Sequence, residues 1–297
     1  MTSLSITGVG RIGGEVAFLA SYLGLVDELV LYDIQSPLLE AQVKDLLHGM
    51  TDLEISTDPE EIKHTDLCVF TAGMPRNPGI RARADLLQAN LIVANQVLPY
   101  LKGFDGILVT VVNPVDVLNY YFSHQGRIDS HRCIGFGGQL DSARFALELD
   151  SQEIEGPRWV LGEHGEHQVP IFSRLYSQVS REERDKILQK IRTASMEVIR
   201  GKGGTVYGPT AHLINLLEAI IDDTQALFPV SCILNGEYGV SRCSLGVPVE
   251  VGWGGILSIE EWALDAWEKA HFTEAARFVQ GLCEQLHDSK APEIKVV

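Results

Sequence analysis

Near its start the chain reads Leu4-Ser5-Ile6-Thr7-Gly8-Val9-Gly10-Arg11-Ile12-Gly13-Gly14, a short apolar run followed by a Gly-x-Gly-x-x-Gly turn. Residues 15–20 then begin an apolar pattern with helical spacing. The order strand, glycine turn, helix is the one that a dinucleotide site requires. In such a site Gly8 allows the tight turn, Gly10 lets the backbone approach a pyrophosphate, and Gly13 lets helix and strand pack closely. The N–H groups at the start of the helix then face the phosphates, so we predict a dinucleotide-binding site here.

A carboxylate follows the next apolar run at the spacing that such a site also requires. Leu29-Val30-Leu31-Tyr32 ends in Asp33, twenty residues beyond Gly13. A carboxylate at this position accepts hydrogen bonds from an adenosine ribose and repels a 2′-phosphate. Asp33 therefore favours NAD over NADP. The alternative interpretation is a cap for the helix expected from Ser36, and the two roles are compatible.

Length and composition indicate a soluble α/β protein. The 297 residues suffice for one large or two medium domains with sizeable cores. Hydrophobic residues make up 45% of the chain, and glycine occurs 28 times. Met1-Thr2-Ser3 runs straight into the first expected strand, and no run approaches the ~18 apolar residues of a membrane span. We expect a cytoplasmic protein.

The charge and the cysteines exclude several classes of function. A formal net charge of −16 argues against a nucleic-acid partner and against an anionic membrane. The five cysteines are an odd number without Cys-x-x-Cys spacing, and most of them lie in apolar runs. We therefore expect reduced core thiols rather than a disulfide framework or a zinc site.

The first ~140 residues alternate between strands and helices, which predicts right-handed crossovers and a parallel sheet. After Gln139 the pattern changes to amphipathic helices and a glycine-rich patch of short antiparallel strands. Ser258-x-x-Glu261 has the spacing of a capping box that opens the last helix. We predict a Rossmann-type parallel-sheet domain over residues 1–141, followed by an α+β catalytic domain with antiparallel strands over residues 142–297. The expected strands are 27–32, 66–71, 106–112, 133–136 and 159–161, and the expected helices are 36–50, 86–101, 181–200 and 208–223.

Arginines gather in the loop that follows the strand ending at Thr71. An acidic protein with this local surplus of positive charge has what a small dianionic substrate needs, because arginine binds carboxylates bidentately. The alternative is a solvated basic loop. The arginines in question are Arg76, Arg81 and Arg83 of the loop and Arg144, three residues after Asp141.

Several motifs occur in an order that resembles the lactate/malate dehydrogenase family, most closely its archaeal, lactate-dehydrogenase-like malate dehydrogenase branch. The resemblance covers nearly the whole chain. The motifs are the glycine turn with Asp33, Thr71-Ala72-Gly73, Asn113-Pro114-Val115-Asp116, Leu140-Asp141-Ser142-Ala143-Arg144, Gly162-Glu163-His164-Gly165 and Gly236-Glu237-Tyr238-Gly239.

The resemblance implies an NAD-dependent malate dehydrogenase, which transfers hydride reversibly between malate or oxaloacetate and NAD or NADH. His164 would be the general acid and base, with Asp141 fixing its tautomer. Arg144 would bind the substrate's C1 carboxylate, and Arg83, on a closing loop, would polarise the C2 carbonyl. Further substrate contacts would come from Asn113, Thr205 and Arg76. The implied cofactor-binding residues are Gly8, Gly10, Arg11, Ile12, Gly13, Asp33, Thr71, Ala72, Gly73, Asn90, Val112 and Asn113.

Substrate choice depends on Arg76 in this resemblance. Lactate dehydrogenases of the family carry Gln at the matching position, whereas malate dehydrogenases carry Arg to pair the second carboxylate. One departure concerns the loop, because three residues (80–82) separate Gly79 from Arg83 where relatives usually have two. Arg81 is therefore a rival for the catalytic loop arginine. A second departure is Glu166-His167, and because no further ligand lies nearby in sequence we expect no metal site.

Two alternatives remain for the function. The first is a lactate or other 2-hydroxy acid dehydrogenase, and the second, from another class, is a catalytically silent NAD-binding sensor. The resemblance further implies a cytoplasmic homotetramer, with a dimer as the alternative, that acts on a small dicarboxylate in the tricarboxylic acid cycle.

Overall fold

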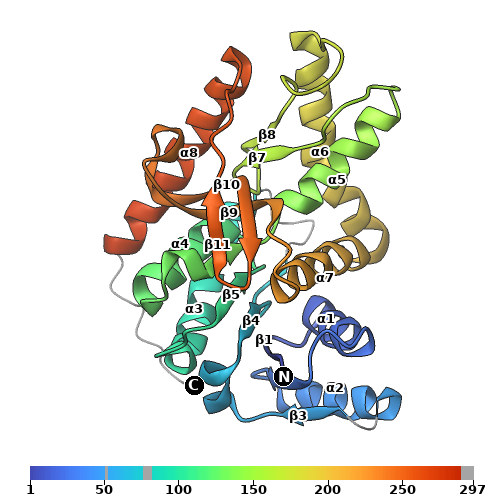
Figure 1. Ribbon diagram of the computed structural model, residues 1–297, viewed down its shortest axis with the longest axis vertical. Helices are drawn as coiled ribbons and strands as arrows, with labels where there is room; N and C mark the ends of the chain where they lie inside the picture. Colours follow the sequence, from blue (N-terminus) through green and yellow to red (C-terminus); the bar gives the residue numbers. More distant parts are fainter. Residues whose placement is uncertain (51–52, 76–81, 289–297) are drawn as a thin grey trace.

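The computed structural model describes residues 1–50, 53–75 and 82–288 (Figure 1). The strands in these residues form one sheet of eleven, in the order β3-β2-β1-β4-β5-β6-β9-β10-β7-β8 with β11 paired to β10. Residues 1–135, here called the first half, contribute β1–β6, and residues 138–288, the second half, contribute the others. The sheet therefore continues from one half into the other.

The first half is a parallel sheet with helical crossovers. Its strands β3-β2-β1-β4-β5-β6 are all paired in parallel, as the alternation of strands and helices predicts. Its elements are β1 (Ser3–Thr7), α1 (Arg11–Tyr22), β2 (Glu28–Tyr32), α2 (Ser36–Gly49), β3 (Glu54–Ser56), η1 (Pro59–His64), β4 (Leu67–Phe70), η2 (Arg83–Leu86), α3 (Leu87–Val97), η3 (Leu98–Leu101), β5 (Ile107–Thr110), α4 (Val115–Gly126), η4 (Ser130–Arg132) and β6 (Cys133–Gly135).

The second half is antiparallel. The long strands β9 and β10 pair along most of their length, and β9 joins the first half through an antiparallel contact between Ser231 and Gly135 of β6. The predicted fold class, a Rossmann-type parallel sheet followed by an α+β unit with antiparallel strands, is confirmed. The elements are α5 (Gly138–Asp150), β7 (Val160–Gly162), β8 (Gln168–Pro170), α6 (Arg181–Lys202), α7 (Tyr207–Ile221), β9 (Ala226–Asn235), η5 (Glu237–Gly239), β10 (Ser241–Gly252), β11 (Gly255–Ile259) and α8 (Ala266–Asp288).

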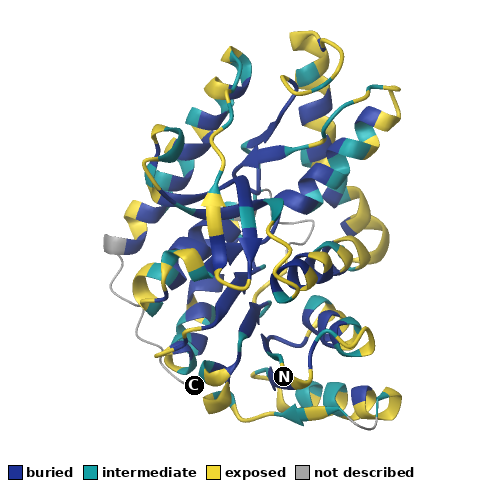
Figure 2. Cartoon of the chain, in the orientation of Figure 1, coloured by how far each residue is buried: buried dark blue, intermediate teal, exposed yellow. Residues whose placement is uncertain are grey.

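The core follows the sheet, most of whose strands are buried, while β3, β11 and the outer faces of the helices are partly exposed (Figure 2). All five cysteines lie in this core as free thiols, as predicted. Burial raises the pKa of the Cys68 thiol to about 12, which keeps it protonated and unreactive at neutral pH. No helix in the described part of the chain is both long and apolar enough to span a membrane.

Two details of the helices differ from prediction. The helix expected over 86–101 is α-helical only over Leu87–Val97 and continues as the 3₁₀ turn η3, because Pro99 has no N–H to continue the α-helical ladder. The predicted domain boundary between residues 141 and 142 falls inside α5, and it stays a prediction.

The capping box predicted at Ser258 and Glu261 is wrong. Ser258 lies in β11, where its hydroxyl donates to Glu250. The box is formed instead by Asp265 and Glu268: the carboxylate of Asp265 accepts from the N–H groups of Trp267 and Glu268, and the Asp265 N–H donates to the Glu268 carboxylate. The strand β11 ends at Ile259 and therefore includes Ser258, so the next pair with the same spacing, Asp265 and Glu268, begins the helix.

We predict that Asp265→Ala lowers the free energy of unfolding by about 1–2 kcal/mol, because it removes the cap of α8 and the ion pair with Arg184. Chemical denaturation measures the effect. The exposed Ser258→Ala is the matched control and should stay within about 0.5 kcal/mol of the original protein. A larger loss for Ser258→Ala than for Asp265→Ala would contradict the assignment of the cap.

Candidate active site

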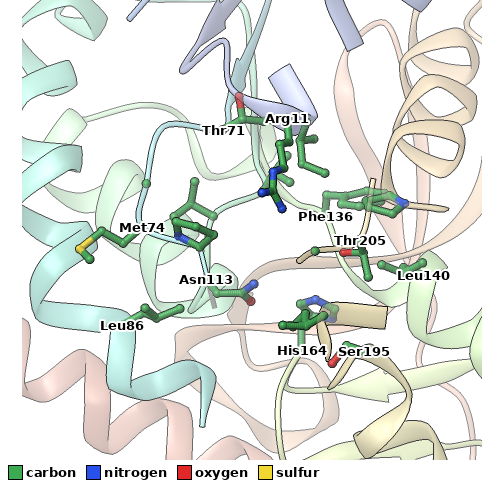
Figure 3. Close-up of a pocket in the computed structure, with 18 of the residues that line it drawn as sticks. Arg11, Thr71, Met74, Leu86, Asn113, Phe136, Leu140, His164, Ser195 and Thr205 are labelled. Atoms are coloured by element: carbon green, nitrogen blue, oxygen red, sulfur yellow. The ribbon is translucent and has the colours of Figure 1, made fainter. Parts of the chain in front are cut away.

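The largest group of predicted site residues meets in a cavity of about 210 Å³ between the two halves. Figure 3 shows Arg11 on one side of this cavity and His164 on the opposite side, with Asn113 to the left and Thr205 to the right. In a parallel sheet, ligands bind beyond the carboxyl ends of the strands, and Thr71 and Asn113 follow β4 and β5 at that edge. The cavity is lined by Arg11, Ile12, Thr71, Gly73, Met74, Pro75, Leu86, Val111, Val112, Asn113, Phe136, Leu140, Arg144, His164, Ser195, Ile199, Gly203, Gly204, Thr205 and Pro209.

The glycine turn supports one wall of the site, which Arg11 and Ile12 line. A side chain at Gly13 would begin 2.0 Å from the carbonyl oxygen of Gly8, so only glycine allows helix α1 to pack this closely on the turn. The Thr71 hydroxyl donates to the same carbonyl at 2.7 Å, which ties the turn to β4. Gly10 is the N-cap of α1 and supplies no side chain to the first N–H groups of the helix. These N–H groups are therefore suited to bind a phosphate.

Asp33 holds the glycine turn from the neighbouring strand. Its Oδ2 accepts from the Val9 N–H at 3.0 Å, and its Oδ1 accepts from the Gln35 N–H at 2.9 Å. The N-cap of α2 is Gln35, so Asp33 precedes the capping position. Each carboxylate oxygen can accept a second hydrogen bond, which leaves Asp33 able to bind a ribose hydroxyl.

Asn90 connects two loops at the cavity wall. Its side chain is fully buried, its Oδ1 accepts from the Met74 N–H at 2.7 Å, and its Nδ2 donates to the Asn113 carbonyl at 2.7 Å. Asn90 is not among the residues that line the cavity. In this structure its amide holds in place the two loops that do line it.

His164 is paired with a buried carboxylate. Its Nδ1 lies 2.6 Å from Asp141 Oδ2, and Arg144 Nη1 donates to Asp141 Oδ1 at 2.8 Å. Asp141 and Arg144 lie one turn apart on α5, whereas His164 follows β7. A side chain at Gly137 would begin 2.4 Å from His164 Cγ, so the glycine before α5 makes room for the ring. The arrangement leaves Nε2 as the ring nitrogen that can exchange a proton in the cavity.

A second buried carboxylate holds the backbone of His164, and the sequence interpretation assigned it no role. Asp116 Oδ2 accepts from the His164 N–H at 2.9 Å, and Asp116 Oδ1 accepts from the Ser231 hydroxyl at 2.6 Å. Burial, followed by the nearby charge of Glu163, raises the pKa of the Asp116 carboxyl to about 7. The signal was present, because Asp116 is the last residue of the Asn113-Pro114-Val115-Asp116 motif.

The predicted site residues fall into three groups: those that line the cavity, those that lie behind its wall, and those outside the described residues. Nine of them line the cavity: Arg11, Ile12, Thr71, Gly73, Val112, Asn113, Arg144, His164 and Thr205. Gly8, Gly10, Gly13, Asp33, Ala72, Asn90 and Asp141 support the wall without lining it. Arg76 and Arg81 lie outside the described residues, as does the side chain of Arg83, whose backbone begins η2.

Sequence reasoning missed part of the lining. Ser195 and Ile199 of α6 and Leu140 of α5 face the cavity, and Phe136 precedes α5. These side chains lie on amphipathic or apolar stretches whose pattern does not distinguish a residue facing a cavity from one facing the core.

Within residues 1–50, 53–75 and 82–288 there is no group of three His, Cys, Asp or Glu side chains that could hold a metal ion. His167, the residue of the unusual Glu166-His167 pair, stacks on Phe278 and has its Nδ1 3.4 Å from Glu163. It does not line the cavity.

A glycine turn for a dinucleotide and a buried histidine–carboxylate pair in one cavity define a nicotinamide-dependent oxidoreductase. Family models of the lactate/malate dehydrogenase NAD-binding domain and of the lactate/malate dehydrogenase α/β C-terminal domain match residues 2–135 and 138–288. The chain belongs to the lactate/malate dehydrogenase family, as the ordered motifs predicted, and its cofactor is NAD.

The relatives of this chain include proteins named malate dehydrogenase and proteins named L-lactate dehydrogenase. A malate dehydrogenase of Halobacterium salinarum is 38% identical, over 93% of this chain and 96% of its own length. An L-lactate dehydrogenase 2 of Lactococcus lactis is 31% identical, over 95% and 97%. The structure of a malate dehydrogenase of Archaeoglobus fulgidus in complex with NADH has a TM-score of 0.86 at 28% identity and covers 96% of this chain and all of its own.

We predict that Asp116→Asn makes the stability of the protein less dependent on pH. The folded-state pKa of about 7 lies above the ~3.9 of an unfolded aspartate, so between these values the folded protein binds more protons. This contribution to stability is therefore greatest at low pH and is lost as the pH rises toward 7. Asn does not titrate, and its single side-chain oxygen cannot replace both acceptors of the carboxylate.

The measurement is chemical denaturation at pH 5.5 and pH 7.5. The free energy of unfolding of Asp116→Asn should be lower than that of the original protein at pH 5.5, and this difference should shrink by about 1–2 kcal/mol at pH 7.5. The exposed Asp105→Asn is the control for a change of net charge. A deficit that is constant or grows with pH would show that Asp116 is ionised throughout this range in the folded protein.

Proposed function

We propose that this protein is an NAD-dependent malate dehydrogenase that interconverts malate and oxaloacetate. The observation that carries the proposal is the contact of His164 with Asp141 and of Asp141 with Arg144 in a cavity shared with the glycine turn. A proton relay, a carboxylate-binding guanidinium and a dinucleotide turn together suit hydride transfer to a 2-oxo acid. The malate dehydrogenases among its relatives support the choice of substrate.

The residues present fit NAD. The first N–H groups of α1 suit the pyrophosphate, and Asp33 suits the adenosine ribose. Asn113 Oδ1 is buried at the cavity with no hydrogen-bond partner among the described residues. A buried acceptor without a partner is costly, so a bound ligand with an N–H or O–H donor would satisfy it. The proposed contacts of the cofactor are the residues that the family resemblance implies, with Asn90 acting through the two loops that its buried amide holds.

In the proposed mechanism, bound NADH supplies the hydride for the substrate's C2 carbon. His164 carries the proton that C2 oxygen receives, and Asp141 stabilises the imidazolium that exists before the transfer. Arg144, which donates an N–H to Asp141, would bind the C1 carboxylate through its guanidinium. We propose that Arg83 polarises the C2 carbonyl, while Asn113 and Thr205 orient the substrate.

The choice between substrates is assigned to Arg76, which would pair the second carboxylate of oxaloacetate. Leaving this arginine unpaired against the methyl group of pyruvate would cost about 2–5 kcal/mol. A lactate dehydrogenase would lack this preference, and a silent NAD-binding sensor would not require the His164–Asp141 pair.

We further propose a cytoplasmic enzyme of the tricarboxylic acid cycle and a homotetramer, with a dimer as the alternative. The side chains of Phe18 and Tyr22 on α1 and of Ile34 before α2 support assembly, because they are large, apolar and exposed in one protomer. Light scattering measures the number of subunits.

The proposed substrate is tested by NADH oxidation with oxaloacetate and with pyruvate, repeated with NADPH. We expect a strong preference for oxaloacetate and for NADH. Arg76→Gln should shift the oxaloacetate-to-pyruvate ratio of kcat/KM by at least about 30-fold toward pyruvate. Arg81→Gln, the same charge change in the same loop, should leave this ratio unchanged. Equal rates on both substrates in the original protein would refute the role of Arg76.

We predict that His164→Asn lowers kcat by at least about 100-fold, because the variant cannot supply the proton. NADH binding, followed by fluorescence, should stay within a few-fold of the original. His167→Asn is the matched control and should keep kcat within a few-fold, since His167 lies outside the cavity. Unchanged turnover in His164→Asn would refute the proton-relay role of His164 and would favour the alternative of a catalytically silent NAD-binding sensor.

A further inference from the structure

One side chain of the glycine turn reaches across the cavity to the second half. Arg11 is the first residue of α1, and its Nη1 donates to the carbonyl of Gly203 at 2.7 Å, although the two residues are 192 positions apart. Both residues line the cavity, and Figure 3 shows the Arg11 side chain pointing into it. The bond thus links the turn expected to hold the cofactor's phosphates with the end of α6.

The acceptor lies at the end of a helix. Gly203 is the C-cap of α6 in the left-handed conformation, at φ +80°, and its N–H donates to the Ile199 carbonyl at 2.9 Å. The carbonyl end of a helix carries partial negative charge, which favours a guanidinium there. A side chain at Gly204 would begin 3.0 Å from Arg11 Nη1, so the guanidinium lies directly against the backbone of both glycines.

The segment that Arg11 contacts leads directly into the substrate side of the cavity. Thr205 follows the two glycines and lines the cavity together with Arg144 and His164. Helix α7 begins two residues later and packs against α1 (Figure 1). A change in the position of residues 203–205 would therefore move a wall of the space in which substrate binds.

We infer that Arg11 is a positioning residue that ties the cofactor's pyrophosphate to the Gly203–Thr205 segment, so that bound NADH orders the substrate side of the cavity. A guanidinium has five N–H donors in a fixed plane and can bond a carbonyl and a phosphate oxygen together. A lysine ammonium carries the same charge but lacks this planar fork. The identity of the substrate in this inference rests on the proposed function.

The alternative is that Arg11 contacts only the phosphate. Both roles predict weaker NADH binding when Arg11 is changed, so cofactor affinity alone cannot separate them. The distinction lies in what happens at saturating NADH. If Arg11 contacts only the phosphate, changing it has no effect on substrate binding once NADH saturates the protein. If Arg11 is a positioning residue, changing it still alters the order of residues 203–205 and the affinity for substrate.

The experiment compares the original protein with Arg11→Lys, Arg11→Ala and the control Lys202→Gln. Lys202 lies beside the same glycines, but its ammonium packs over the Tyr207 ring, so the control removes a nearby charge without removing the bond. The first readout is backbone hydrogen exchange of residues 199–207 with and without NADH. The second is calorimetric binding of hydroxymalonate, a dicarboxylate similar to malate, to protein saturated with NADH.

We expect NADH to slow exchange of residues 199–207 in the original protein and in Lys202→Gln. In Arg11→Lys and Arg11→Ala this protection should be lost, and the hydroxymalonate Kd at saturating NADH should rise about 10-fold. The inference is overturned if both Arg11 variants, once saturated, match the original protein in exchange and in hydroxymalonate Kd. It is also overturned if NADH leaves exchange of this segment unchanged in the original protein.

Failure of the proposed function would look different. If hydroxymalonate does not bind the NADH-saturated original protein, the dicarboxylate assignment fails. The role of Arg11 is then decided by hydrogen exchange without the binding measurement, because the exchange experiment requires NADH and no substrate analogue.

Discussion

Two buried carboxylates hold His164 from different parts of the chain, and the geometry of the site depends on them. Asp141 of α5 pairs with the imidazole, and Asp116 of α4 accepts the backbone N–H of the same residue. A buried carboxylate is stable only when hydrogen bonds replace its hydration, so neither acid can lose its partners cheaply. The histidine ring and its backbone are consequently fixed by separate elements, one from each half of the chain.

The same pairing connects the two halves. Asp116 belongs to the first half, whereas its partners His164 and Ser231 belong to the second. Ser231 is also the residue of β9 that pairs with Gly135 of β6, where the parallel and antiparallel parts of the sheet meet. The cavity therefore opens between two parts of one continuous sheet. On its opposite side the bond from Arg11 to Gly203 also joins the two halves.

The sequence predicted those features whose signal is local. The glycine turn and the buried strands follow from short-range pattern, and the structure has them as predicted. The prediction of the cap of α8 was wrong because Ser258-x-x-Glu261 and Asp265-x-x-Glu268 offer the same spacing, and only the extent of β11 decides between them. Pattern likewise could not show that the Asn90 amide holds two loops together, since its partners follow β4 and β5.

The sequence by itself determined the fold class, the dinucleotide turn, the prediction of NAD and, through a set of ordered motifs, the family. These properties depend on residue type and spacing along the chain, because strand, turn and helix preferences act over a few residues. The tertiary structure decided that Asp116 supports His164, that Ser195 and Ile199 line the cavity, and that Arg11 reaches Gly203. Such contacts join residues 48 to 192 positions apart. Packing of whole elements brings them together, and no local pattern carries that information.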